Sequence, residues 1–161
     1  MFYITLIDDH STIFPQIFPN KVNAVYRYNA NHGPGYARQW GIEKTNNPWI
    51  MFIDTGDIFV SRDSFDAIAK AIEEHPDANV ISFSYFYKDK TPNEASNRMH
   101  GKIYKREFIE KYGITFCPES SYMNEDIGFN RTCRLLTDFV YIDFPIIRWV
   151  EDKNSITQKD N

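Results

Sequence analysis

The sequence predicts an α/β fold, in which a mostly parallel, Rossmann-like sheet carries helices on its flanks. Two observations support this prediction. Segments rich in β-branched and aromatic residues alternate with segments whose apolar residues recur every three or four positions. The 161 residues also have the length of one domain, which is enough to bury a core. We therefore expect residues 1–161 to form a single domain.

Residues 48–59, PWIMFIDTGDIF, predict the position of the functional site. The five apolar residues 49–53 are typical of a strand buried on both faces in the middle of a sheet. Asp54 and Asp57 follow, with Gly56 between them to permit a tight turn. Ligands bind outside the carboxyl ends of central strands in open α/β sheets. These two carboxylates are therefore candidates for holding a metal and a phosphorylated or sugar ligand.

The other elements follow from residue type and periodicity. Strands are predicted where β-branched and aromatic residues cluster, at residues 2–7, 23–27, 79–87, 99–104, 139–142 and 146–150. Helices are predicted at residues 36–44, 61–75, 105–112 and 124–136, where apolar or capping residues have helical spacing. Residues 88–97 are polar and without periodicity, and we expect them to form a mobile loop.

Two polar features near the N-terminus are candidates for binding. Asp8 and Asp9 follow the first predicted strand and precede Ser11 and Thr12. This pattern fits either a helix-capping turn or a polar ligand loop, and the local sequence favours the turn. Arg38 lies near the start of a predicted helix, where the helix dipole disfavours a cation. Its presence there indicates a role other than helix stability.

A second acidic pair, Glu125 and Asp126, lies in the first turn of the predicted helix that Asn124 is expected to cap. Carboxylates there complement the helix dipole, which alone explains them. Alternatively, one of them projects into the cleft, where an apolar wall and a partner acid raise its pKa into the range of a general base. The residues themselves leave both explanations open.

Composition narrows the class of protein. The formal net charge of −4 argues against a protein that grips nucleic acid by unspecific charge. Cys117 and Cys133 lack zinc-site spacing, and we expect both to be reduced and mostly buried. No secretory signal and no apolar run near 18 residues is present, so we expect a soluble, cytoplasmic protein without a membrane span.

Five motifs, in order, resemble the family 2 glycosyltransferases of the GT-A fold. They are HGPGYARQWGI, FIDTGD, MHGKIYKREFI, NEDIGFN and NSIT, and the resemblance covers nearly the whole chain. It implies a transferase of the hexosyl or pentosyl type that uses a nucleotide-sugar donor, most readily a UDP-sugar. Such enzymes are typically inverting, with Mn²⁺ or Mg²⁺ on the donor diphosphate. By this resemblance the chain begins on the family's second strand, so we expect the first strand to be absent from this sequence.

The resemblance also assigns donor-binding residues. Asp8 and Asp9 match the acidic loop that holds the nucleoside, with Asp9 as the contact to the base. Arg38 matches the arginine beside that base, which would explain a cation at this end of a helix. Asp54 matches the first acid of the metal and ribose motif, and Gly101 the glycine where the chain approaches the sugar.

The metal and the catalytic base are implied in the same way. The family usually has aspartate where this chain has Gly56, so Asp57 is expected to take over coordination. Asp152 stands where the family often has histidine, and a carboxylate there suits a hard cation and could compensate for Gly56. Asp126, next to Glu125, matches the catalytic base.

The resemblance favours a glycosyltransferase over two other classes. A non-catalytic nucleotide- or carbohydrate-binding module of the same fold is the alternative. A nucleotidyltransferase is disfavoured by the lack of a glycine-rich, lysine-bearing triphosphate loop. The acceptor stays open among a glycan, a lipid-linked sugar, a protein and a modified nucleobase, and so does a homo-oligomer. An acceptor is expected to contact residues 83–87, which are rich in aromatics, and the loop after them.

Overall fold

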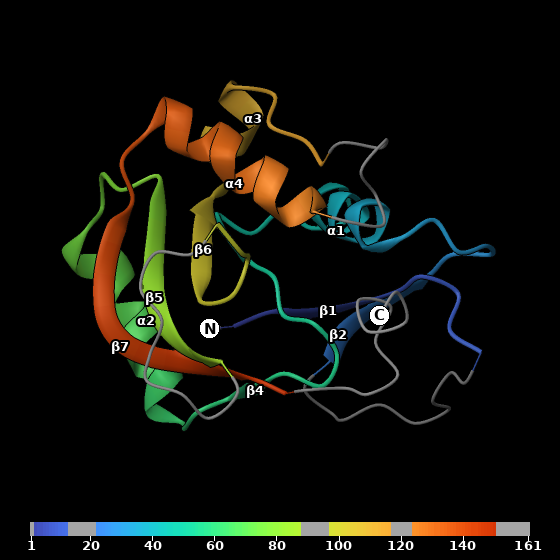
Figure 1. The fold of residues 1–161 in the computed structure, drawn as a ribbon, viewed down its shortest axis with the longest axis horizontal. Helices are drawn as coiled ribbons and strands as arrows, with labels where there is room; N and C mark the ends of the chain where they lie inside the picture. Colours follow the sequence, from blue (N-terminus) through green and yellow to red (C-terminus); the bar gives the residue numbers. More distant parts are fainter. Residues whose placement is uncertain (1, 13–21, 88–96, 117–123, 151–161) are drawn as a thin grey trace.

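The computed structural model describes residues 2–12, 22–87, 97–116 and 124–150. The elements are, in order, β1 (Ile4–Asp8), β2 (Val22–Arg27), α1 (Pro34–Glu43), β3 (Trp49–Met51), β4 (Ile58–Phe59), α2 (Asp63–Glu74), β5 (Val80–Tyr87), β6 (Lys102–Lys105), α3 (Arg106–Lys111), α4 (Glu125–Leu136) and β7 (Val140–Trp149). The predicted α/β class is confirmed, with strands and helices interspersed along the chain (Figure 1).

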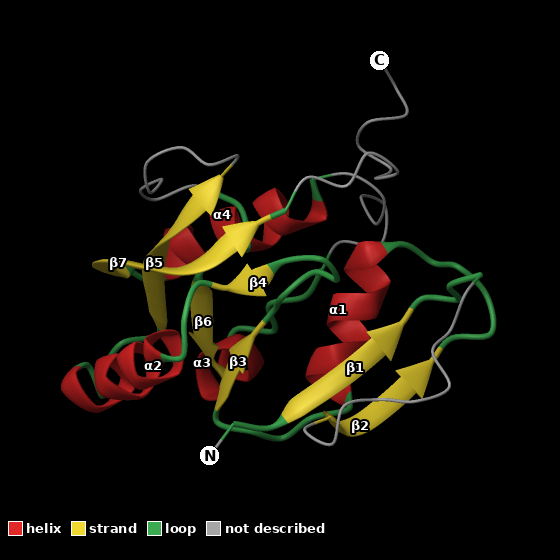
Figure 2. Ribbon diagram, turned by 90° about the horizontal axis from the view of Figure 1, so that it is seen from below, coloured by secondary structure: helices red, strands yellow, loops and turns green. Residues whose placement is uncertain are grey.

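The described strands form two sheets, and the prediction of a mostly parallel sheet was wrong. β1 and β2 form a parallel pair, and the other strands form a mixed sheet in the order β3-β6-β5-β7-β4 (Figure 2). Within the larger sheet only β5 and β7 are parallel, while β6 pairs antiparallel with both β3 and β5. The sheet is mixed because β6 returns beside β5, its predecessor in sequence, and needs no parallel crossover.

The central position predicted for residues 49–53 is also wrong. β3 covers only Trp49–Met51 and lies at an edge of the five-stranded sheet. Ile50 is buried, whereas Ile53 is 44% exposed. Only the first three residues of the apolar run belong to the strand. Phe52 follows the strand and packs edge-on against Phe116 and Phe129. Residues 52–57 then connect β3 to β4 at the other edge, and the sheet is curled (Figure 1).

Alternate residues of β5 and β6 face two separate cores, and Figure 2 shows these strands between α2 and α4. Val80 and Tyr104 belong to the core that includes residues of α1, α3 and α4. Ile81 and Ile103 belong to the core beneath α2. This alternation is the period-two pattern of a sheet covered on both faces, so the strands carry few solvated positions.

Two local expectations were wrong, and others lie outside the described residues. Residues 139–142 and 146–150, predicted as two strands, form the single strand β7, whose register against β5 shifts between Phe83 and Tyr85. Asn124 occupies the N-cap position of α4 but is left-handed (φ 61°) and makes no capping bond through its side chain. The predicted mobile loop lies almost wholly outside the described residues, as does Cys117, while Cys133 is a buried free thiol.

Candidate functional site

Three side chains that can ligate metals meet at one end of the strands of the five-stranded sheet. Asp54 follows β3, Asp57 directly precedes β4, and His100 lies two residues before β6. One ligand atom from each lies within 4.8 Å of the others. Sequence analysis identified both carboxylates and missed the histidine. Its clue was the position directly before Gly101, within a motif already singled out.

The cluster buries polar atoms that lack hydrogen bonds within the described residues. The Asp57 side chain is 5% exposed and that of His100 15% exposed, with 3.5 Å between Asp57 Oδ2 and His100 Nε2. Neither that oxygen nor either ring nitrogen of His100 has a hydrogen-bond partner there, while Asp57 Oδ1 accepts from the Val150 N–H at 3.2 Å. Buried polar groups are normally paired, so these atoms fit a cation that carboxylate and imidazole ligands would hold.

Burial also sets the ionisation of this pair. Burial, opposed by the Val150 hydrogen bond and reinforced by the nearby carboxylate of Asp54, raises the pKa of Asp57 to about 6. Burial lowers the pKa of the His100 imidazole. Both effects disfavour charge in the absence of a cation. A neutral imidazole is the form that binds metals.

A close backbone approach fixes the position of His100. The Phe83 N–H donates to the Gly101 carbonyl at 2.8 Å, and Gly101 is left-handed with φ +68°. A Cβ atom at Gly101 would lie 2.7 Å from the Phe83 carbonyl oxygen. The Tyr85 ring stacks on His100 with ring centroids 5.1 Å apart. The backbone geometry alone thus requires glycine at position 101, whether or not a sugar binds near it.

Arg38 connects three parts of the chain at the site. Its Nη2 donates to Asp54 Oδ1 at 2.8 Å, and its Nη1 pairs with Glu125 Oε1. The guanidinium therefore joins α1 to the end of β3 and to the start of α4. These two carboxylates account for a cation at the end of a helix that disfavours it.

The second acid of the pair, Asp126, lies near the His100 turn. Asp126 is buried, its Oδ1 accepts from the Ile127 N–H at 2.8 Å, and the Arg98 Nη1 lies 3.5 Å from the same oxygen. Glu125, by contrast, is occupied by Arg38. Of the two acids, Asp126 is thus the one beside the turn that carries the metal-ligand candidate.

Buried polar residues hold that turn against α4. Asn130 donates through Nδ2 to the carbonyls of Asp126 and Asn97, at 3.0 and 3.1 Å, and accepts from the Tyr104 hydroxyl at 2.7 Å. Lys102, 1% exposed, donates to the Arg98 carbonyl at 2.6 Å. Sequence analysis did not identify these residues, because a lone buried Asn or Lys has no sequence signature.

Asp8 and Asp9, at the end of β1, hold the backbone there and the residues just before α1. Asp9 accepts from the His32 and Gly33 N–H groups at 2.9 and 2.6 Å. Asp8 accepts from the Ser11 N–H at 3.1 Å, which is turn-capping geometry, and pairs with Arg27. The structure thus brings together Asp54, Asp57, Arg38, Glu125, Asp126 and the Gly101 turn, while Asp8 and Asp9 form a separate group and Asp152 lies outside the described residues.

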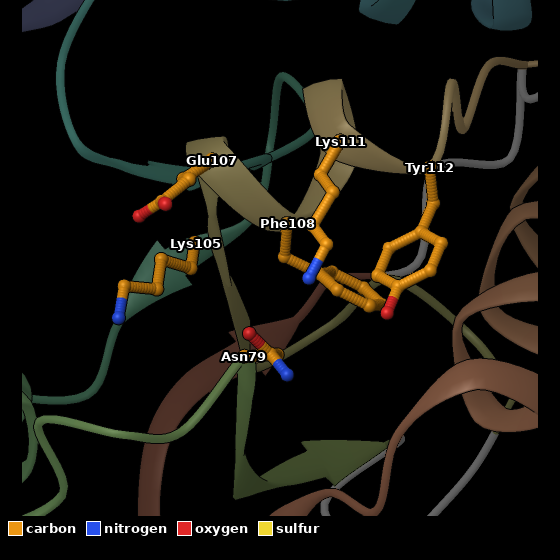
Figure 3. A pocket seen from close by; sticks show the side chains of 6 residues that line it. All are labelled: Asn79, Lys105, Glu107, Phe108, Lys111 and Tyr112. Atoms are coloured by element: carbon orange, nitrogen blue, oxygen red, sulfur yellow. The ribbon is translucent and has the colours of Figure 1, made fainter.

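A shallow hollow of about 160 Å³ lies elsewhere, where β5 begins and β6 ends (Figure 3). Its lining residues are Asn79, Lys105, Glu107, Phe108, Lys111 and Tyr112. Because β5 and β6 are antiparallel, the hollow lies at the end of these strands opposite to the carboxylate cluster. The residues that could bind a metal therefore do not line it.

Comparison with known proteins identifies the family. A model of glycosyl transferase family 2 matches residues 2–129. The chain belongs to this family. No curated protein matches its sequence. Within the described residues of this family 2 chain, no helix has the length and apolarity to cross a membrane.

Solved structures of S. aureus TarS (residues 1–349) share the GT-A fold of the family 2 chain. One of them has a TM-score of 0.77 at 19% identity, with 91% of this chain covered. The complex with UDP-GlcNAc has a TM-score of 0.81 at 17% identity, with 99% covered. The chain spans about half the length of these structures, namely 50% and 52%.

Gly101→Ala should destabilise the fold more than Gly113→Ala. Both glycines are left-handed, which costs any other residue about 1–2 kcal/mol, but a Cβ at Gly113 meets nothing within 4 Å. Alanine at Gly101 meets the Phe83 carbonyl as well, and we expect a total loss of about 3 kcal/mol in the free energy of unfolding. Urea unfolding measures both variants, and equal losses would rule out the close approach.

Asp57→Asn should stabilise the metal-free protein at neutral pH. A pKa raised from 3.8 to about 6 in the folded state means that the native carboxyl binds its proton more tightly than the unfolded one. The stability of the wild type therefore falls as pH rises from about 4 to about 6, and the variant avoids about 2 kcal/mol of this loss. Urea unfolding in EDTA at pH 4, 5, 6 and 7 should give curves that coincide at pH 4 and separate by pH 7. The exposed Asp77→Asn is the control, and a destabilised Asp57→Asn at pH 7 would contradict the burial argument.

Proposed function

We propose that this family 2 chain transfers a sugar from a nucleotide-sugar donor to an acceptor hydroxyl with inversion. The observation that carries the proposal is the cluster of Asp54, Asp57 and His100 beside Asp126, in which buried atoms of Asp57 and His100 have no hydrogen-bond partner among the described residues. Family membership supports the same reaction class. The similarity to the TarS complexes with UDP and with UDP-GlcNAc makes UDP-GlcNAc the first donor to test.

The proposed metal ligands are Asp54, Asp57 and His100. A divalent ion bound there supplies positive charge that offsets the charge developing on the nucleoside diphosphate as it leaves. Two carboxylates and one imidazole suit Mn²⁺ better than Mg²⁺, because imidazole is a poor ligand for the harder ion. In this set His100 would take the place of the carboxylate that the family usually has at the position of Gly56.

Asp126 is proposed as the general base that removes the proton of the acceptor hydroxyl. It is buried beside the His100 turn, and Arg98 and the Ile127 N–H orient its carboxylate. The nucleoside is proposed to lie over the loops that Asp8 and Asp9 fix, next to α1. Arg38 would then hold Asp54 and Glu125 in place between nucleoside and metal.

A binding module without turnover is the second candidate. Gly56 favours it, because the acidic motif has one carboxylate fewer than the family pattern. Under that alternative the chain would bind UDP-GlcNAc and Mn²⁺ and release no UDP. Turnover and binding measured on the same sample therefore separate the two.

Asp126→Asn tests the base. Hydrolytic release of UDP from UDP-GlcNAc with Mn²⁺, in which water takes the sugar and gives up the proton to the base, should fall about 10²- to 10⁴-fold in the variant. UDP affinity should stay unchanged, because only proton removal is lost. Asp77→Asn, an exposed acid elsewhere, should match the wild type. Full turnover in a folded Asp126→Asn protein would remove this residue from the mechanism.

His100→Ala tests the metal site. We expect Mn²⁺ affinity in the presence of UDP, measured by calorimetry, to fall at least tenfold, because one of three protein ligands is lost. His75→Ala, at the end of α2, is the matched control and should bind Mn²⁺ like the wild type. Unchanged affinity in His100→Ala would show that the ion lies elsewhere.

A further inference from the structure

We infer that Asn130 is a positioning residue for the proposed transfer, because its side-chain amide fixes the His100 turn, residues 97–101, relative to Asp126. The inference rests on the function proposed above and adds a residue that acts through the proposed base and a proposed metal ligand. It follows from the hydrogen bonds of Asn130, from its burial in an apolar core, and from the other contacts that hold the turn.

The amide of Asn130 joins two segments of the chain. Asn130 lies one helical turn after Asp126 on α4, and its side chain is completely buried. Its Nδ2 donates to the Asp126 carbonyl at 3.0 Å and to the Asn97 carbonyl at 3.1 Å, while its Oδ1 accepts from the Tyr104 hydroxyl at 2.7 Å. A flipped amide would place Oδ1 against two carbonyl oxygens, so the hydrogen bonds select one orientation of the side chain.

The surroundings of this amide are apolar. Met99, Tyr104, Phe129 and Cys133 belong to the core into which α4 packs. For packing alone, a set of apolar side chains of the same shape would serve nearly as well as a paired polar set. Directed hydrogen bonds are what Asn130 supplies in addition, and a fully paired buried network makes the arrangement around it rigid.

Other contacts hold the same turn to the sheet. The Phe83 N–H donates to the Gly101 carbonyl at 2.8 Å, which connects the turn to β5. Lys102, at the start of β6, donates through Nζ to the Arg98 carbonyl at 2.6 Å. These bonds locate the turn on the strands. Asn130 adds the connection from the turn to α4 and therefore to Asp126.

Two groups of the proposed reaction depend on this connection. His100 lies on the turn, and Asp126 lies in the first turn of α4. In the proposed reaction His100 contributes to the site of the donor diphosphate, and Asp126 takes the proton of the acceptor hydroxyl. The separation of these two side chains thus determines how the leaving group and the nucleophile are aligned. A displacement of about 1 Å between reacting groups can lower a rate about 10²-fold.

Proton NMR of His100 reports the position of the turn in the metal-free chain. The Tyr85 ring stacks on the imidazole with ring centroids 5.1 Å apart, so its ring current contributes to the shift of the His100 Hε1 signal. Spectra are recorded in EDTA at one fixed pH, and the signal is assigned by its loss in His100→Ala. We expect Asn130→Leu, which removes all hydrogen bonds of the amide, to move this signal toward the position of an unstructured histidine.

A core variant separates positioning from general loss of stability. Cys133→Ala removes a buried side chain of the same helix and the same core, so it should lower the free energy of unfolding in urea and leave the His100 signal unchanged. If Asn130→Leu is unfolded, the double variant Asn130→Leu/Tyr104→Phe replaces it. That variant also removes the hydroxyl that Asn130→Leu alone would leave buried and unpaired, which is less costly.

Kinetics test the connection to the base. At saturating Mn²⁺, Asn130→Leu should lower kcat for hydrolytic release of UDP from UDP-GlcNAc about ten- to a hundredfold, and leave KM near the wild-type value. In the Asp126→Asn background the same substitution should cost little more, because residues that act through one another are not additive. A loss of folded protein would instead lower the rate equally in both backgrounds.

Three results would overturn the inference. They are an unmoved His100 signal in a folded variant that lacks the Asn130 amide, an equal movement of that signal in Cys133→Ala, and the full kinetic cost of Asn130→Leu in the Asp126→Asn background. The proposed function fails separately, if the wild type releases no UDP. The spectra then decide by themselves whether Asn130 fixes the turn.

Discussion

The ion-pair bridge through Arg38 is the interaction on which the arrangement of the site depends. Asp54 and Glu125 lie far apart in sequence, and the fold brings both to the guanidinium of one helix residue. Glu125 is buried, and a buried carboxylate without a partner would destabilise the fold by several kcal/mol. The bridge therefore fixes the end of β3, the start of α4 and the body of α1 relative to one another. Asp126 takes its position from its neighbour Glu125, which the bridge anchors.

The neighbouring cluster follows the opposite principle. Around Arg38 every carboxylate has a partner, whereas at Asp57 and His100 buried nitrogen and oxygen atoms lack hydrogen bonds within the described ranges. Such atoms cost stability, and proteins retain them chiefly where a ligand will complete them. Rigid parts support this unsatisfied centre: the Gly101 approach to Phe83, the Tyr85 stack and the Asn130 hydrogen bonds. The site thus combines a tightly paired frame with a centre whose polar groups are incompletely paired.

The sequence was informative where chemistry depends on residue type and less so where it depends on topology. The acids after the apolar run could be identified because carboxylates at a strand end are unusual, and Arg38 because it contradicts the helix dipole. His100 could not, since one histidine before a glycine resembles many loop residues.

The position of β3 was misjudged because an apolar run of five does not reveal that its fourth member, Phe52, leaves the strand to pack on Phe116. The mixed sheet escaped prediction because strand direction depends on how β6 returns beside β5. The functional roles of all the residues assigned from the sequence stay predictions, namely those of Asp8, Asp9, Arg38, Asp54, Asp57, Gly101, Glu125, Asp126 and Asp152.

The connection between β3 and β4 has a mechanical consequence. These strands are the two edges of the five-stranded sheet, residues 52–57 join them directly, and the sheet between them is curled (Figure 1). Asp54 and Asp57 lie within this short connection, and Asp57 is tied to the end of β7 through Val150. An ion bound by Asp54, Asp57 and His100 would link this connection to the turn before β6 and would so stabilise the curled sheet. Because such an ion would bind the folded sheet and not the unfolded chain, tighter binding of the ion would also raise the free energy of unfolding.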